Sequence, residues 1–560
     1  MKRNRFYIYC KQTVFFLAAV CAIPVNSHPA LLSPDASGSL DPTFNLIGEK
    51  EIPISPTSGP ASHDQVNGIA VQPDGKIVLA GWVRANINDA SSPEQVGVVR
   101  LNIDGSLDAS FGNSGIVVTQ AATAATNPNS RGQAVAIQSD GKIVVAGMAN
   151  ANTPFSQQDF ALVRYSANGS LDTAFGSGGR VTGTFTSSGF STLTASASSL
   201  LIQPDGKIVA GGLAQSVSTS TDFALARYNS DGTLDATFGT GGKVTTDFGS
   251  VSEQSIGIAF DTDQGQLKIV SVGAVAGGST NHNFGIARYN ANGTLDPTFG
   301  TGGKVVTSVD PSGADAYSVA VASDGTILVA GGGPNFTLAR YDTHGALVPS
   351  FGSGGIVIRT MAGGAFPDAL AIQQDGKIII SGSYGGEFGL ERYAANGTLD
   401  TSFGSSTIGP ADQICIPSPC IPPIVGANSF AMILEPSTAK ILIAGDSGVS
   451  SSHQTFAVAR LLNDSTAPTP TPTPTPSVAQ VDGRALTPDG RGLRNTTVSM
   501  TNPQGTTVTT TTSSFGLFSF TGVTTGQSYT FRVQSRLYRF ASQTVQVNGN
   551  MTLPDFTGLE

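Results

Sequence analysis

The stretch FALARYNSDGTLDATFGTGGKV, residues 223–244, returns almost unchanged as FGIARYNANGTLDPTFGTGGKV at residues 284–305. Each copy begins with a strand-like run that contains an Arg-Tyr pair. A turn rich in Asn, Asp and Gly follows, and a Gly-Gly pair then precedes another strand-like run. Repetition of this kind indicates one supersecondary unit copied along the chain and so predicts a repeat architecture.

A second phrase precedes each of these stretches and predicts a β-hairpin. In VAIQSDGKIVVAG, residues 135–147, an Asp-Gly pair separates two apolar runs. Both residues of such a pair accept positive φ, which makes this a strong hairpin signal. Copies turn at Gly75, Gly141, Gly206, Gly325 and Gly376, and divergent copies occupy 260–272 and 432–445.

Together the phrases predict four short antiparallel strands per unit, which we call a, b, c and d. No helical periodicity interrupts them, so the expected fold is all-β, and units of this length and composition are typical of β-propeller blades. The strand c arginine recurs at positions 100, 164, 227, 288, 340, 392 and 460, which predicts seven blades. The N-terminal GSLDPTF has no preceding strands, and the last repeat lacks this phrase. We therefore expect the N-terminal segment to supply strand d of the last blade and to close the ring.

The spacing within strand c predicts a structural ion pair in each hairpin between strands c and d. Phe223, Leu225 and Arg227 point to one side of an alternating strand, so the arginine is expected to be buried and to need a partner. An aspartate stands eight residues further on in most units. The predicted pairs are Arg100 with Asp108, Arg164 with Asp172, Arg227 with Asp235, Arg288 with Asp296, and Arg392 with Asp400. Arg340 has Val348 at this position, and Arg460 is predicted to pair with Asp41 across the ring closure.

These phrases, DGKIVVAG, FALARYNSDGTLDATFG and GGKVTT, resemble the delta-60 family of bacterial repeats. The resemblance covers residues 38–463 and implies an extracellular, propeller-like fold. It implies no ligand or reaction.

The N-terminus predicts export. Basic residues between Lys2 and Lys11 precede an apolar run over 13–23, which is too short to span a membrane comfortably and is typical of a signal peptide over 1–27. A lipoprotein signal at Cys21 is the alternative, although a small residue is expected where Val20 stands. Cys415 and Cys420 lie beyond the signal peptide, in a proline-rich loop, and are expected to form a disulfide.

A Pro-Thr tract, APTPTPTPTPS at 467–477, predicts a stiff spacer of roughly 30 Å within a linker over 464–477. The alternating residues at 478–560 then predict a small β-sandwich. This segment resembles the carboxypeptidase-regulatory-like domain, of transthyretin-like fold. The residues concerned are VDGR at 481–484, GLRNTTV at 492–498, SFGLF at 514–518 and GQSYT at 526–530. The resemblance implies a non-catalytic accessory domain.

Several motifs that could indicate chemistry are better explained as turns. GDSG at 445–448 aligns with the end of strand b in other units, and GTGGK at 239–243 and 300–304 lacks phosphate-loop spacing. Asn229, Asp231 and Asp235 are common turn residues and too few for a calcium site. We therefore expect no catalytic residues, no metal site and no cofactor. A net charge of −9 without a basic stripe argues against nucleic-acid binding.

The variable connections indicate where a ligand would bind. In a propeller the b–c and d–a connections share one face, and the a–b and c–d turns share the other. The first face has the long, irregular segments, at 83–96, 149–159, 214–222, 272–283, 405–428 and 446–455. His63, His282 and His453 are expected there, and His344 on the opposite face. The favoured interpretation is a secreted, non-catalytic module that binds an extracellular protein or glycan at this face. A structural matrix component and a propeller lyase or hydrolase with a central site are the alternatives.

Overall fold

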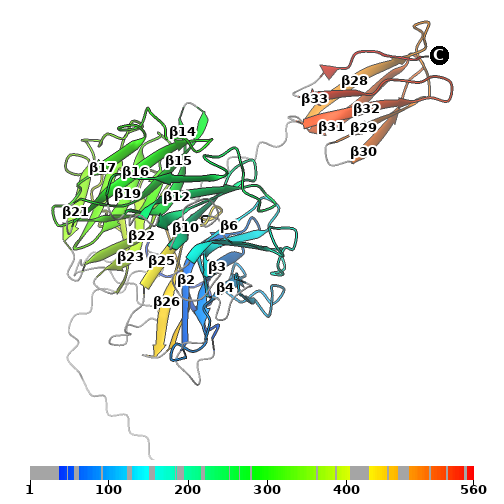
Figure 1. Cartoon of the computed structure of the whole chain (residues 1–560). Coiled ribbons are helices and arrows are strands. Elements are labelled where there is room, and N and C mark those ends of the chain that lie inside the picture. The colour runs from blue at the N-terminus through cyan, green and yellow to red at the C-terminus, as the bar shows by residue number, and fades with distance from the viewer. Residues whose placement is uncertain are drawn as a thin grey trace, which may run out of the picture. The chain divides into compact units, whose positions relative to one another are not determined.

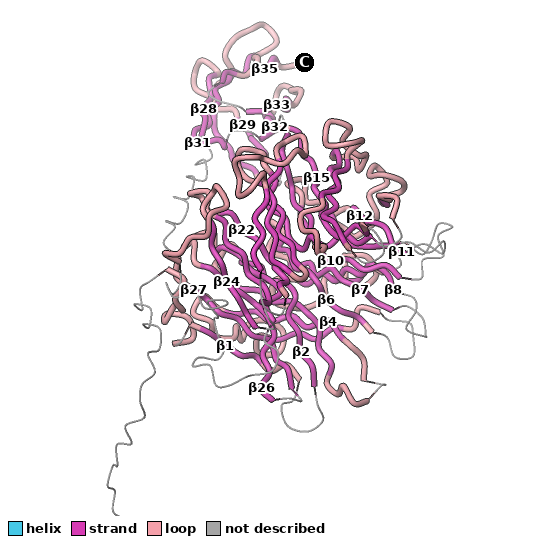
Figure 2. Tube along the Cα trace, turned by 90° about the vertical axis from the view of Figure 1, so that its left-hand side faces the viewer, coloured by secondary structure: helices cyan, strands magenta, loops and turns pink. Residues whose placement is uncertain are grey.

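A computed structural model describes the chain as an all-β protein of two compact units, Met1–Ser465 and Thr466–Glu560 (Figure 1). The described residues are 37–46, 48–55, 62–89, 92–122, 129–150, 158–182, 185, 194–215, 221–250, 253–263, 265–277, 281–360, 364–384, 387–403, 428–450, 453–463, 478–502, 506–524, 527–547 and 551–559. Within these ranges every regular element is a strand, and none is a helix, let alone one long enough to cross a membrane (Figure 2).

The larger of the two compact units is built from successive antiparallel sheets. Each set of antiparallel strands corresponds to one repeat of the sequence, and from here on unit 1, unit 2 and so on denote these repeats in chain order. In unit 1, β2 (Ser62–Val71), β3 (Ile77–Arg84), β4 (Gln95–Leu101) and β5 (Ile116–Thr119) pair in sequence order. The same order recurs in unit 2, with β6 (Ser130–Ile137), β7 (Ile143–Asn150), β8 (Gln158–Tyr165) and β9 (Arg180–Val181), and in unit 3, with β10 (Thr194–Ile202), β11 (Ile208–Gln215), β12 (Thr221–Tyr228) and β13 (Lys243–Thr246). Unit 4 contains β14 (Glu253–Asp263), β15 (Gln266–Ala276), β16 (His282–Asn290) and β17 (Lys304–Thr307), and unit 5 contains β18 (Asp315–Val321), β19 (Ile327–Gly332), β20 (Asn335–Tyr341) and β21 (Ile356–Thr360). Unit 6 contains β22 (Ala365–Ile372), β23 (Ile378–Tyr384) and β24 (Glu387–Tyr393) among its described residues.

The last sheet combines strands from both ends of this unit. Unit 7 contains β25 (Asn428–Leu434), β26 (Ile441–Ser450) and β27 (His453–Leu461). β1 (Glu49–Ile52) pairs antiparallel with β27, with Glu49 opposite Ala459 and Ile52 opposite Phe456. A segment from the N-terminal part therefore occupies the strand d position of the last sheet.

The first strands of the units lie side by side. β2, β6, β10, β14, β18, β22 and β25 each contact the next in this order, and β25 contacts β2. In Figure 1 the yellow strands β25 and β26 accordingly lie next to the blue β2. Apolar side chains fill the space between neighbouring sheets: Val98 and Phe111 of unit 1 share a cluster with Ile143 and Tyr165 of unit 2. This arrangement of sheets is that of a β-propeller.

A β-bulge near the start of each first strand explains the glycine of the VVAG phrase. In unit 2 the register shifts between Gly132 and Ala134. A Cβ on Gly147, in the neighbouring strand, would lie 1.9 Å from the Arg131 carbonyl oxygen, closer than any side chain allows. Glycines with the same contact are Gly81, Gly147, Gly212, Gly273, Gly331 and Gly382.

The smaller unit contains two sheets around one apolar core. One sheet has β31 (Leu517–Thr524), β28 (Val478–Leu486), β34 (Met551–Thr552) and β35 (Phe556–Thr557). The other has β30 (Thr507–Thr511), β29 (Thr497–Thr501), β32 (Gln527–Gln534) and β33 (Gln543–Val547). Val481 and Phe518 from the first sheet share a buried cluster with Val498 and Phe531 from the second.

Candidate functional site

The two faces of the larger unit differ in their polar groups. We call the face formed by the a–b and c–d turns the hairpin-turn face, and the face formed by the b–c and d–a connections the long-connection face. The hairpin-turn face has a network that repeats from unit to unit. The long-connection face has polar groups that do not repeat.

On the hairpin-turn face, the structure places each predicted arginine and aspartate in contact. Arg227 Nε donates to Asp235 Oδ2 at 2.8 Å, and both side chains are buried. The other nitrogen–oxygen distances are 2.8 Å for Arg100–Asp108, 2.9 Å for Arg164–Asp172, 2.9 Å for Arg288–Asp296, 2.8 Å for Arg392–Asp400 and 2.7 Å for Arg460–Asp41. The last pair joins residues that are 419 positions apart in the chain.

A lysine that the sequence reasoning missed completes each pair. Lys440 Nζ lies 2.7 Å from Asp41 Oδ2, opposite Arg460. The equivalent contacts are Lys76–Asp108, Lys142–Asp172, Lys207–Asp235, Lys268–Asp296 and Lys377–Asp400, at 2.9 to 3.3 Å. Burial alone would raise the pKa of Asp41, but hydrogen bonds from Lys440 and Thr43, with the charge of Arg460, lower it to about 2. The lysine that follows the Asp-Gly pair in the repeated DGK phrase could have indicated this contact.

In unit 5 the strand c arginine has different partners. Arg340 has no aspartate eight residues on, and its Nη2 lies 2.9 Å from Asp324 Oδ2 in the a–b turn. Thr326 stands where other units have the lysine and accepts a hydrogen bond from Arg340 Nε at 3.0 Å. The lysine and the aspartate are thus lost together.

The arginines also connect neighbouring units. Arg288 Nη1 of unit 4 donates to the Thr343 carbonyl oxygen of unit 5 at 2.8 Å, and Arg340 of unit 5 donates to Ala395 of unit 6 at 2.9 Å. Arg460 of unit 7 donates to the Ile103 carbonyl oxygen of unit 1 at 2.6 Å. Because this face repeats a contact that holds units together, its arginines are explained as structural residues.

The predicted disulfide, Cys415–Cys420, lies outside the described residues, as do the signal peptide over 1–27 and the linker over 464–477. The side chain of His453 likewise lies outside the described part of the chain. His63 and His282 lie on strands that start at the long-connection face, and His344 lies in a c–d turn on the other face.

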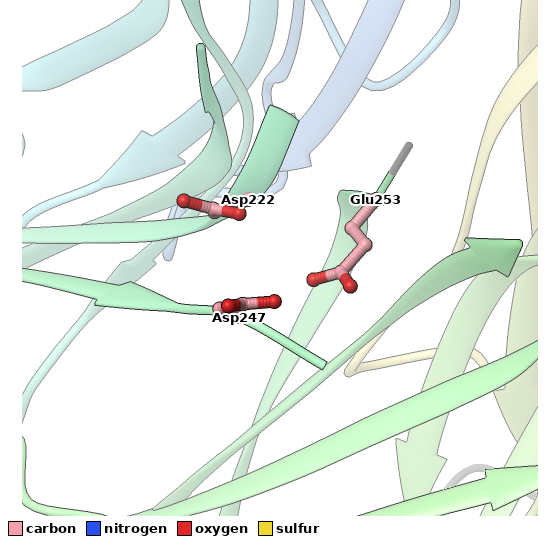
Figure 3. A group of neighbouring side chains, drawn as sticks. All are labelled: Asp222, Asp247 and Glu253. Atoms are coloured by element: carbon pink, nitrogen blue, oxygen red, sulfur yellow. The ribbon is translucent and has the colours of Figure 1, made fainter. Parts of the chain in front are cut away.

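An acidic group lies on the long-connection face between units 3 and 4 (Figure 3). Asp222 is near the start of β12, Asp247 follows β13, and Glu253 begins β14. One oxygen from each of these carboxylates lies within 4.8 Å of the others, so the group could contribute three ligands to a hard cation.

Two of these carboxylates already have structural partners. Glu253 accepts hydrogen bonds from the backbone N–H groups of Phe248 at 2.7 Å and Ser250 at 2.8 Å. Asp247 accepts one from Gly249 at 2.5 Å. In unit 1, Asp64 accepts a hydrogen bond from the Ser55 N–H and so holds the d–a connection there.

Asp222 is the member of the acidic group that has a buried oxygen, Oδ1, without a hydrogen-bond partner among the described residues. Burial, and then the charges of Asp247 and Glu253, raise the pKa of Asp222 to about 6. This carboxyl group therefore titrates near neutral pH.

A second group lies between units 1 and 2. The His63 ring packs on Trp82 with centroids 4.5 Å apart, and the Arg131 guanidinium lies 4.4 Å from the Trp82 ring centroid. Arg131 also forms an ion pair with Glu94 at 2.5 Å. Burial, and then the charge of Arg131, lower the pKa of His63, which favours a neutral imidazole.

A third group lies at the starts of β16, β18 and β22. His282 Nδ1 is 2.6 Å from Asp315 Oδ1, and the Tyr317 hydroxyl donates to Asp315 Oδ2 at 3.5 Å. The Tyr317 and Phe366 rings meet edge to face at 6.1 Å, and the Phe366 side chain is largely exposed. Burial, and then the charges of Asp315 and Asp368, raise the pKa of Tyr317. This group joins a histidine–carboxylate pair to an accessible aromatic ring.

Comparisons with known proteins support the fold. A family model described as "Domain of unknown function (DUF5122) beta-propeller" matches residues 72–111, 138–175, 203–238, 268–299 and 373–403. Each matched segment ends at the phenylalanine of the recurring T-F-G, S-F-G or A-F-G phrase. No curated protein matches the chain.

Solved structures that resemble the chain include a protein of unknown function from Dyadobacter fermentans, with 11% identity, 74% of this chain and 99% of that chain covered, and a TM-score of 0.35. Trypanosoma rangeli sialidase has 12% identity, 74% and 59% coverage, and a TM-score of 0.39. Polysaccharide lyase Uly1 has 11% identity, 71% and 89% coverage, and a TM-score of 0.38. The sheet arrangement and the family match together identify the chain as a β-propeller repeat protein.

Proposed function

We propose that this chain is an exported, non-catalytic binding module whose ligand site lies on the long-connection face of a seven-bladed propeller. The observation that supports this most is the asymmetry between the faces. The hairpin-turn face repeats one structural network, whereas the long-connection face holds three unrelated polar groups. Residues that differ between otherwise repeated units are free to serve recognition.

The finer architecture belongs to the same proposal. The pairing of β1 with β27, the contact of β25 with β2 and the Arg460–Asp41 ion pair support a ring of seven units closed by the N-terminal strand. The delta-60 resemblance, the Cys415–Cys420 disulfide and a carboxypeptidase-regulatory-like domain at 478–560 are proposed on the sequence patterns given above. Export is proposed from the basic and apolar N-terminal residues.

A screen of the full chain on glycan and peptide arrays tests the proposed function. For any ligand found, Arg131→Ala, Asp222→Asn and Phe366→Ala alter one group each on the long-connection face. Asp104→Ala and Asn292→Ala are matched controls in exposed turns of the other face. We expect at least one substitution of the first set to weaken binding and both controls to retain it. Loss of binding in the controls alone would contradict the assignment of the face.

An enzyme is the second candidate, and the His282–Asp315 pair favours it. A carboxylate that binds one ring nitrogen orients the imidazole and leaves the other nitrogen for proton transfer. Here Nδ1 faces Asp315, and the His282 side chain is 43% exposed. Turnover of an array ligand by the parent chain, abolished in His282→Gln, would replace the binding module with the enzyme.

A further inference from the structure

We propose that the third group, composed of His282, Asp315, Tyr317, Phe366 and Asp368, binds a neutral carbohydrate, with the sugar ring stacked on Phe366. This inference rests on the proposed function and names the ligand class of its binding face.

Corresponding positions of two neighbouring strands build the site. The carbonyl oxygens of Asp315 and Phe366 face Gly331 and Gly382, the glycines opposite the bulge in units 5 and 6. Asp315 and Phe366 are therefore equivalent positions of the two units. Tyr317 and Asp368 each lie two residues further on, in the bulges of β18 and β22. One strand thus offers a carboxylate and then an aromatic ring, and its neighbour offers an aromatic ring and then a carboxyl group.

Units 1 to 4 do not present this combination. Their positions equivalent to Phe366 are Gln65, Arg131, Ser196 and Gln254, as their contacts with the opposite glycines show. Two residues further on, these four units have Asn67, Gln133, Ser198 and Ile256. Since the scaffold accepts polar side chains at the first position, burial does not require a phenylalanine there.

The Phe366 ring is accessible enough to contact a ligand. Its relative exposure is 45%, although it begins a strand whose next residue, Pro367, is buried. Tyr317 meets it edge to face and limits its motion. The apolar C–H face of a sugar ring fits the negative face of such a ring, and burial of both removes apolar surface from water.

The group that contains Phe366 also has side chains that can form hydrogen bonds with a ligand. Among the described residues, no protein group donates a hydrogen bond to the Asp368 carboxyl, and Asp315 uses one position on each oxygen for His282 and Tyr317. A carboxylate has about four acceptor positions, so Asp315 keeps two. The half-exposed His282 ring offers its Nε2. Sugar hydroxyl groups, which both donate and accept, match these partners.

The charge of the site favours a neutral ligand. Burial raises the pKa of the Asp368 carboxyl group. The Asp315 carboxyl group faces His282. Repulsion between this carboxyl group and the carboxylate of an acidic sugar disfavours acidic sugars.

Affinity electrophoresis of the full chain in gels that contain a neutral polysaccharide tests this inference. Separate gels would contain a β-glucan, a mannan or a xylan, and a gel with polygalacturonate would provide the acidic comparison. We expect retardation by at least one neutral polymer. Phe366→Ala should weaken this retardation about tenfold, Asp368→Leu should weaken it as well, and Phe366→Trp should retain it.

Gln254→Ala, at the equivalent position of unit 4, is the matched control and should bind as the parent does. Melting temperatures of all variants exclude loss through unfolding. Equal retardation of Phe366→Ala and the parent would overturn the inference, as would retardation by polygalacturonate alone. If peptides bind at this face and no neutral polysaccharide does, the carbohydrate inference fails while the proposed function stands. If nothing binds at this face, both fail.

Discussion

In every unit except unit 5, the aspartate paired with the strand c arginine contacts both that arginine and a lysine. Asp296 Oδ2 receives Arg288 and Lys268 at 2.9 and 3.1 Å, and the Asp296 side chain is only 2% exposed. Burial acting alone would raise the pKa of Asp296, but hydrogen bonds from Thr298 and Lys268, with the charge of Arg288, lower it to about 2. The ionised form is therefore the stable form in the fold.

A pH series of unfolding should show this effect. Because the folded pKa lies below its ordinary value of 3.8, each such aspartate contributes stability above about pH 4 that disappears as the pH falls towards 2. Asp296→Asn should lower the free energy of unfolding by about 2 kcal/mol at pH 7. The difference from the parent should shrink at pH 2, as urea denaturation can measure. A difference that stays constant between pH 7 and pH 2 would contradict the ionic role.

Asp222 should have the opposite pH dependence. Its pKa is raised to about 6, so the folded protein binds the proton more tightly than the unfolded chain and loses stability as the pH rises through 6. Asp222→Asn removes that cost and should raise the free energy of unfolding by about 1 kcal/mol at pH 8, after allowance for solvent screening, with no gain at pH 4. Asp205→Asn, in an exposed turn, is the control. A variant less stable than the parent at pH 8 would refute this account.

At the scale of the element, the a–b and c–d hairpins of one unit form a single electrostatic module. Lys207 follows the a–b turn, Asp235 begins the c–d hairpin connection, and Arg227 lies between them in strand c. Unit 5 replaces the lysine with Thr326 and the aspartate with Val348, and Arg340 turns to Asp324. Neither hairpin changes alone, which indicates that the two charges are kept or lost as a pair.

The bulge in each first strand gives a prediction at the same scale. A Cβ on Gly273 would lie 1.8 Å from the Gln254 carbonyl oxygen, whereas one on Gly257 would have its closest contact at 3.2 Å. Gly273→Ala should therefore cost at least about 2 kcal/mol of stability, and Gly257→Ala less than about 1 kcal/mol. Thermal unfolding of the two variants checks this order, and equal melting temperatures would show that the bulge relaxes without cost.

The sequence predicted contacts within one hairpin and missed contacts that depend on how separate segments fold together. The eight-residue spacing named Arg227 and Asp235 because alternation in a strand and the turn length are local properties. Lys207 was missed because its contact depends on how two hairpins lie beside each other. The trio of Asp222, Asp247 and Glu253 comes from two connections without a repeated pattern, and only the three-dimensional fold brings the carboxylates together.

At the scale of the whole molecule, the same contact passes from unit to unit. Asn45, in the N-terminal segment, donates its N–H to the Asp104 carbonyl oxygen of unit 1 at 2.7 Å. In the corresponding contact between units 3 and 4, Gly239 donates to Asn292 at 2.8 Å. The N-terminal segment thus makes with unit 1 a contact of the kind seen between units 3 and 4, and Asp41 lies in this segment with 1% of its side chain exposed.

Substitution of Asp41 should therefore act beyond its own hairpin. Asp41→Ala removes the buried carboxylate that Arg460 and Lys440 share, although Glu435 stays 3.5 Å from Arg460, so the change should cost about 3 kcal/mol. Because Asp41 and β1 both lie in the N-terminal segment, β1 should also detach more often from β27. Thermal unfolding and hydrogen exchange of the amides at 49–52 measure the two effects.

Two controls separate ring closure from the loss of an ion pair. Asp172→Ala removes the equivalent anion inside unit 2, where the chain continues on both sides, so its faster exchange should remain within that unit. Asp104→Ala changes an exposed turn and should leave the melting temperature within about 1 °C of the parent. If Asp41→Ala and Asp172→Ala both destabilise the protein but exchange at 49–52 rises in neither, Asp41 is an ordinary hairpin residue. If it rises in Asp41→Ala alone, the Arg460–Asp41 pair fastens the N-terminal strand to the last unit.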